Sequence, residues 1–144
     1  MDNITLTKQE EKLLSNRNWM RFATITPQGI PHVVPMAGVY EEGTIYMDTD
    51  KDSKKIKNVT ECNIGAVLVD EGENYNELRG ILLQGEVNIL ENQNVREYVI
   101  NKITAKYTKG KLPNSAANRN EMVDRVVIEL IPKNYTSWDF RQDY

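Results

Sequence analysis

The residues best suited to chemistry lie in one short basic segment in the first half of the chain. There the sequence places two hydroxyl side chains, Thr49 and Ser53, just before two consecutive lysines, Lys54 and Lys55. The segment follows a predicted strand and opens a predicted short helix, whose N-terminus would offer free amides and a partial positive charge. Together these groups predict a phosphate-binding turn, which we call the basic turn (Thr49, Ser53, Lys54 and Lys55). The alternative is a solvated helix face interleaved with acidic residues.

A second candidate segment runs from Pro31 to Met36. Its prolines leave backbone carbonyls and some amides free to meet a flat heterocycle, whereas the alternative is an edge strand whose prolines block aggregation. His32 has no neighbour in the sequence that would orient it for catalysis. Trp138 is typical either of a ligand contact or of core packing. Since no side chain stands out as an acid or base, the catalytic residues stay unassigned.

Length and composition exclude several classes of protein. The 144 residues predict one domain, and 18 basic against 21 acidic residues give a net charge of −3, which argues against nucleic-acid binding. One cysteine and one histidine allow neither an intrachain disulfide nor a Cys/His zinc site, so no metal is expected. The N-terminus does not resemble a signal peptide, and apolar runs fall far short of the ~20 residues that span a membrane. We therefore expect a cytoplasmic protein without a membrane partner.

The pattern of residues around these segments predicts a mainly β chain with flanking helices. Helices are expected after a capping box at Thr7, over 51–58 and after the cap residue Asn92. Strands are expected over 19–25, 30–40, 44–48, 64–70, 79–90, 124–131 and 135–140, with turns at 26–29, 41–43 and 132–134 and a polar loop over 106–120. Gly80 and Gly85 mark bulges or close approaches. Tight turns without a βαβ rhythm favour an antiparallel barrel in a single domain, 1–144, with an N-terminal helix in 1–18 and the barrel in 19–140.

Several of these segments occur together in the order and spacing of a known family. They are Phe22–Ile25, the Pro27–Gly29 turn, Pro31–Met36, Ile45–Thr49, Ser53–Asn58, Ile64–Val69, Leu83–Val87 and the closing Pro132–Phe140. In this order they resemble the pyridoxamine 5′-phosphate oxidase-like, FMN-binding split-barrel family. The resemblance implies a six-stranded antiparallel split barrel and a homodimer that binds FMN in clefts at the subunit interface.

The resemblance also implies a set of cofactor-binding residues: Val34, Pro35, Met36, Asp48, Thr49, Ser53, Lys54, Lys55, Gly80 and Trp138. By position, the basic turn matches the phosphate-binding residues of the family, and Val34 to Met36 match the strand beside the isoalloxazine ring. Gly80 stands where some members place a glutamine, so that side-chain contact is missing here. Trp138 would reach the flavin of the other subunit.

The function implied by this resemblance is that of a flavin-dependent oxidoreductase with FMN as cofactor. Vitamin B6 oxidation itself is not favoured, because an Arg- and His-bearing substrate segment is not found before Tyr144. The alternatives are a deazaflavin-dependent reductase, using Lys106, Lys109 and Lys111 for a longer acidic tail, and a non-enzymatic flavin carrier or electron-transfer protein. A haem-binding member with His32 as ligand and an interaction domain without a cofactor also stay open. Neither the substrate nor the electron donor follows from the sequence.

Overall fold

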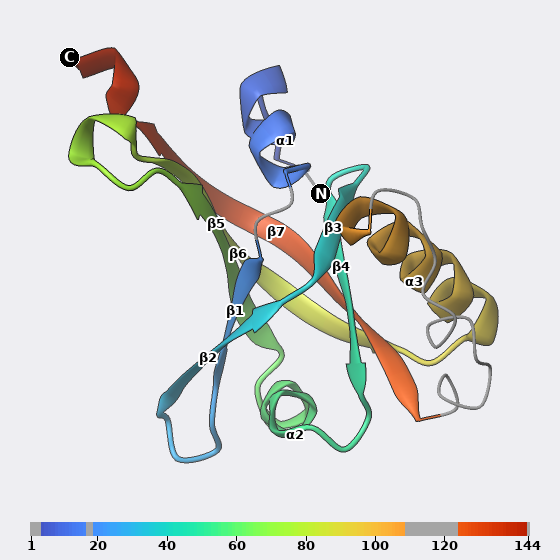
Figure 1. The fold of residues 1–144 in the computed structure, drawn as a ribbon. Coiled ribbons are helices and arrows are strands. Elements are labelled where there is room, and N and C mark those ends of the chain that lie inside the picture. Colours follow the sequence, from blue (N-terminus) through green and yellow to red (C-terminus); the bar gives the residue numbers. More distant parts are fainter. Residues whose placement is uncertain (1–3, 17–18, 109–123, 144) are drawn as a thin grey trace.

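The computed structural model describes residues 4–16, 19–108 and 124–143. In this part of the chain, seven strands form one antiparallel sheet in the order β2-β1-β5-β6-β7-β4-β3 (Figure 1). The strands are β1 (Met20–Ile25), β2 (Pro31–Met36), β3 (Gly38–Glu41), β4 (Thr44–Asp50), β5 (Ile64–Glu71), β6 (Arg79–Leu90) and β7 (Arg125–Asp139). The helices are α1 (Lys8–Leu14), α2 (Lys54–Glu61) and α3 (Gln93–Tyr107), with short 3₁₀ turns at η1 (Tyr75–Glu77) and η2 (Phe140–Asp143).

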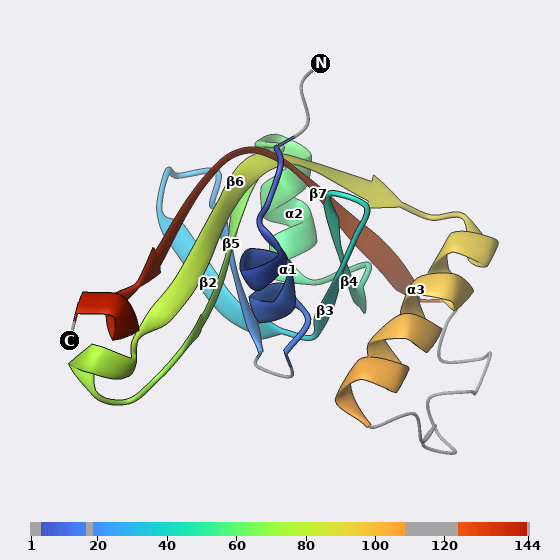
Figure 2. The ribbon, with the colours of Figure 1, turned by 90° about the horizontal axis from the view of Figure 1, so that it is seen from above.

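The sheet closes on itself through the segment that links β2 to β3. These two strands form the opposite edges of the sheet, yet only Ala37 separates them in the chain. Because one residue joins the two edges, the sheet must curl into a half-barrel (Figure 2). The split-barrel prediction is confirmed, but with seven strands rather than six. The predicted single strand over 30–40 bends at Ala37 and contributes one strand to each edge.

The last strand differs from the prediction of a turn at 132–134. Instead, β7 continues through this region, and the sheet absorbs one extra residue as a bulge: Gln84 pairs with Asn134, but Gly85 pairs with Pro132. Proline has no N–H to donate to the ladder, so the pairing shifts by one residue where it occurs. Gly85 is required here, because a Cβ at this position would overlap the carbonyl oxygen of Ile131. The prediction of a bulge at Gly85 is therefore confirmed.

One hydrophobic core fills the barrel, and two helices cover its ends. The core includes the inward-facing side chains of every strand except β3, for example Phe22, Ile45 and Leu83. Buried leucines of α1 join the core at one end, and Ile56 and Val59 of α2 join it at the other (Figure 1). The third helix, α3, lies outside the barrel against β3, β4 and β7. The barrel interior is thus occupied by side chains, and ligand sites must lie at its rim or outer face.

The two predicted helix caps are present. Thr7 and Glu10 form the reciprocal capping box of α1, and the side chain of Asn92 accepts the amides of Asn94 and Val95 at the start of α3. This helix extends to Tyr107, so the first residues of the predicted loop over 106–120 are helical instead. The remainder of that loop lies outside the described residues. Within the described ranges, no helix is both long and apolar enough to cross a membrane.

Candidate functional site

The basic turn lies where β4 leaves the barrel and α2 begins. The alternation of β4 points Thr49 inward, where it is buried, and its hydroxyl donates to the Ser53 hydroxyl at 3.5 Å. Ser53 is the N-cap residue of α2, but its side chain makes no capping hydrogen bond, and the first turn holds no acidic residue. The first amides of α2 therefore have no side-chain cap and are oriented to receive an anion.

The two lysines of the basic turn differ in their surroundings. Lys54 is exposed, whereas Lys55 is half-buried. Burial lowers the pKa of Lys55; the nearby Asp50 carboxylate opposes that change and the Arg125 guanidinium adds to it. An ammonium that has lost part of its hydration gains more from a bound anion than a fully solvated one does. Lys55 is therefore the better placed of the two to hold a phosphate.

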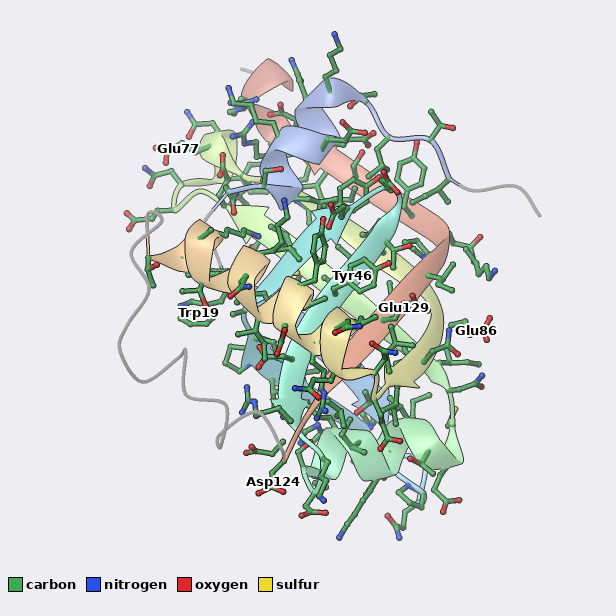
Figure 3. The ribbon with its side chains drawn as sticks, turned by 90° about the vertical axis from the view of Figure 1, so that its right-hand side faces the viewer. Trp19, Tyr46, Glu77, Glu86, Asp124 and Glu129 are labelled. Atoms are coloured by element: carbon green, nitrogen blue, oxygen red, sulfur yellow. The ribbon has the colours of Figure 1, made fainter. Side chains whose placement is uncertain are left out.

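Beside the basic turn, an ion-pair cluster joins the end of β4 to the start of β7. The guanidinium of Arg125 donates from Nε and Nη2 to Asp48 at 3.1 and 2.6 Å, and from Nη1 to Asp50 at 3.1 Å. Figure 3 shows Asp124 at this end of the molecule, where its carbonyl accepts the Lys51 amide at 2.9 Å. Asp48 is thus engaged by a side chain of its own chain, through a residue, Arg125, that the sequence did not single out.

His32 supplies an unsatisfied polar atom near the same end of the barrel. Its strand neighbour across the β1–β2 pair is Thr24, whose hydroxyl accepts the side-chain amide of Asn58 from α2 at 3.0 Å. The Nδ1 atom of His32 is buried and has no hydrogen-bond partner. A buried polar atom without a partner is destabilising, so a ligand group that bonded to it would remove this penalty.

The other predicted residues of β2 are placed differently from one another. Met36 is buried in the core, Val34 packs against the core, and Pro35 is exposed. Since β2 is an edge strand, its outer backbone groups face away from the sheet. A flat ligand beside β2 would therefore meet Pro35 and the strand backbone, and not the side chain of Met36.

Gly80 and Trp138 lie together, but far along the sheet from the basic turn. They face each other across the β6–β7 pair, and a Cβ on Gly80 would overlap the indole ring. They line a pocket of about 270 Å³ together with Thr7, Gln9, Glu10, Leu13, Arg79, Ser137 and Asp139. Arg125 and Trp138 are near opposite ends of β7, which crosses the molecule (Figure 1). At ~3.3 Å per residue, the strand between them is roughly 40 Å long.

The structure therefore brings together some of the predicted cofactor-binding residues and separates others. Thr49, Ser53, Lys54 and Lys55 converge in the basic turn, with Asp48 beside them. The Ser53 hydroxyl, the ammonium groups and the uncapped amides form a donor set that fits a phosphate group, while the Thr49 hydroxyl donates to Ser53. Within a single chain, the pocket of Gly80 and Trp138 does not adjoin this set, so the two groups would share one ligand only across two subunits.

A family model described as pyridoxamine 5′-phosphate oxidase matches residues 6–139 of the chain. Among solved structures, a conserved hypothetical protein, Rv2991, from Mycobacterium tuberculosis is 25% identical with a TM-score of 0.84, over 99% of this chain and 90% of that one. An F420 reductase is 23% identical with a TM-score of 0.73, over 91% of this chain and 98% of that one. HutZ, a haem storage protein from Vibrio cholerae, is 13% identical with a TM-score of 0.74, over 96% and 99% of the two chains. A search of curated protein sequences found no significant match.

Proposed function

The chain belongs to the pyridoxamine 5′-phosphate oxidase family, and from this premise we propose that it binds FMN and acts as a flavin-dependent oxidoreductase. The observation that carries the proposal is the basic turn, where an uncapped helix start, two hydroxyls and the half-buried Lys55 converge. Bound flavin would supply the redox chemistry through its ring, while the protein supplies binding, orientation and electrostatics.

Each part of the site has a distinct role in this proposal. Lys54 and Lys55 neutralise the phosphate, and the first amides of α2 donate to its oxygens. The outer edge of β2, with Pro35, lies beside the flat ring, and the Nδ1 atom of His32 offers a further polar contact to the ligand. These groups hold and orient the cofactor; none of them is proposed to transfer a proton.

We propose in addition that two chains form a homodimer with the cofactor between them. Ile30, Val33 and Ile64 are 60%, 59% and 57% exposed, an unusual exposure for large apolar side chains around one hairpin and its neighbouring strand. We propose that in this dimer the Trp138 pocket of one copy lies beside the basic turn of the other. Light scattering of the purified protein tests this proposal, and a monomer that retains FMN would contradict it.

The absorption spectrum and mass of any small molecule released on denaturation test the identity of the cofactor. FMN is expected, with a flavin spectrum and the mass of the mononucleotide. A deazaflavin would support the reductase alternative. The similarity in fold to an F420 reductase favours this alternative. Of the lysines expected to serve its tail, Lys106 already donates to the carbonyls of Leu14 and Gly38, and the others lie outside the described residues.

The absorption spectrum and a separate assay of reduction by NADH or NADPH distinguish the remaining alternatives. A Soret band would support a haem-binding protein, a possibility raised by the similarity in fold to HutZ. A flavin that is retained but not reduced by NADH or NADPH would support a flavin carrier. A protein that neither carries a cofactor when purified nor binds added FMN would refute the proposal.

Replacing Lys55 by alanine tests the phosphate assignment directly. Loss of a charge-assisted hydrogen bond to a dianion is worth about 1.5–3 kcal/mol, so we expect FMN affinity to fall roughly 10- to 100-fold. Riboflavin, which has the same ring but no phosphate, should bind the variant and the wild type equally. The matched control is Lys57→Ala, which removes an exposed lysine from the same helix and should leave FMN binding unchanged. Titration of flavin fluorescence gives both affinities, and an unchanged FMN affinity for Lys55→Ala would refute the assignment.

A further inference from the structure

We propose that Arg125 is a positioning residue for phosphate recognition, because it pairs with two carboxylates that flank the basic turn and offsets one of their two negative charges. The inference rests on the proposed function and adds a residue and an electrostatic mechanism to it. Arg125 would not touch the cofactor; it would act through Asp48 and Asp50.

The register of the sheet produces this arrangement. Asp48 and Asp50 stand on either side of Thr49 in β4, so both carboxylates project from the outer face while Thr49 points inward. Arg125 is the first residue of β7 and lies directly opposite Asp50. From there its guanidinium reaches both carboxylates, with bonds of 2.6 and 3.1 Å to Asp48 and 3.1 Å to Asp50.

Neutralisation matters because the two carboxylates would otherwise oppose phosphate binding. The side chain of Asp48 is only 14% exposed, so water screens its charge poorly. The pKa of Lys55 is affected by both Asp50 and Arg125, after the larger influence of burial, which places this lysine within the field of the cluster. A phosphate held by Lys55 would lie in the same field, where removal of one positive charge weakens the binding of a dianion.

Each nitrogen of the Arg125 guanidinium already donates to a carboxylate. Its Nε, Nη1 and Nη2 atoms all donate to Asp48 or Asp50. The edge formed by Nε and Nη2, which could hold a phosphate in a fork, is occupied by Asp48. The geometry therefore assigns Arg125 an indirect role and predicts that its loss can be compensated by removal of the carboxylates.

The test compares the affinities for FMN and riboflavin in three variants. For Arg125→Gln we expect FMN to bind about tenfold more weakly than to the wild type. This is the effect expected on removing one unit charge roughly 10 Å from a dianion at a partly screened site. Riboflavin affinity should stay within about twofold of the wild-type value. The triple variant Arg125→Gln/Asp48→Asn/Asp50→Asn should regain FMN affinity. Asp50→Asn alone, at an exposed side chain, should strengthen FMN binding. Lys102→Gln, which removes one positive charge from an exposed position on α3, is the control and should change neither affinity.

Each outcome of these binding measurements tests either the role of Arg125 or the proposed FMN-binding function on which that role depends. If Arg125→Gln weakens the binding of FMN and of riboflavin equally, then Arg125 is merely structural and the inference is wrong. The same conclusion holds if Arg125→Gln does not fold and Asp50→Asn leaves FMN binding unchanged. If the triple variant stays as weak as Arg125→Gln, the carboxylates are not the cause and the inference is again wrong. If the wild type does not prefer FMN to riboflavin, the proposed function fails and the inference fails with it.

Discussion

Lys106 should make the protein more stable as the pH rises from about 7.5 to 9.5. Its ammonium donates to the carbonyl of Leu14 at 3.0 Å and to that of Gly38 at 2.7 Å, and thereby joins α3 to the end of α1 and the start of β3. Burial lowers the pKa of this amine from 10.5 to about 8. In that pH range the folded chain releases the proton while the unfolded chain keeps it. Since the unfolded state binds more protons, stability increases with pH.

The size of the effect follows from the two pKa values. A change from 10.5 to about 8 corresponds to ~2 kcal/mol between pH 7.5 and 9.5. The side chain is only partly buried, so solvent screening reduces this to roughly 1 kcal/mol. The pH range ends at 9.5 so that ionisation of tyrosine side chains contributes little to the measured stability. Burial raises the pKa of Tyr107 above its ordinary value, and that group would lower stability only in more alkaline solution.

Urea unfolding at a fixed protein concentration, repeated across this range, measures the effect. The difference in unfolding free energy between the wild type and Lys106→Met should grow by roughly 1 kcal/mol in favour of the wild type from pH 7.5 to 9.5. Lys102→Met, an exposed position one turn earlier on the same helix, should show a constant difference. A constant difference for Lys106→Met as well would refute the reasoning, because the amine would then titrate alike in the folded and unfolded chains.

Two further substitutions test how the fold supports the site. Gly85→Ala should destabilise the protein by about 1–3 kcal/mol in urea unfolding, because the new methyl group would overlap a backbone carbonyl. A variant as stable as the wild type would show that the bulge can relax. Asn58→Ala should cost about 1–3 kcal/mol by leaving the buried Thr24 hydroxyl without its donor. The double variant with Thr24→Val should lose less than the sum of the single losses, and strict additivity would show that the two side chains are not coupled.

Local patterns in the sequence predicted most elements of the fold. The capping residues Thr7 and Asn92, the turn glycine at Gly29 and the strand that begins at Thr44 depend on neighbours within a few residues, and each is found as expected. The two errors in the strands both concern a proline-bearing segment. In β7 the pairing shifts at Pro132, whereas β2 pairs with β1 without a shift and the chain bends after it, at Ala37. Whether the chain turns, bends or bulges depends on the strand opposite, which local patterns do not identify.

The candidate site shows the same division between local and distant information. The basic turn was predicted because its hydroxyls and lysines are close in the sequence. Arg125 was not, because it is 75 residues from Asp50 and meets it only through the register of β4 and β7. The unpaired Nδ1 atom of His32 likewise depends on its burial where β2 pairs with β1, and no sequence signal would have found it.

By itself, the sequence determined the types of element and a basic start of α2, since both depend on residue type and short-range order, and its resemblance to a known family predicted the split-barrel class. Only the tertiary structure decided that Asp48 and Asp50 are both paired with Arg125 and that Trp138 lies far from the basic turn in its own chain. The physical reason is that charge neutralisation and ligand reach depend on distances through space. In a curled antiparallel sheet, those distances are set by strand order and register rather than by separation along the chain.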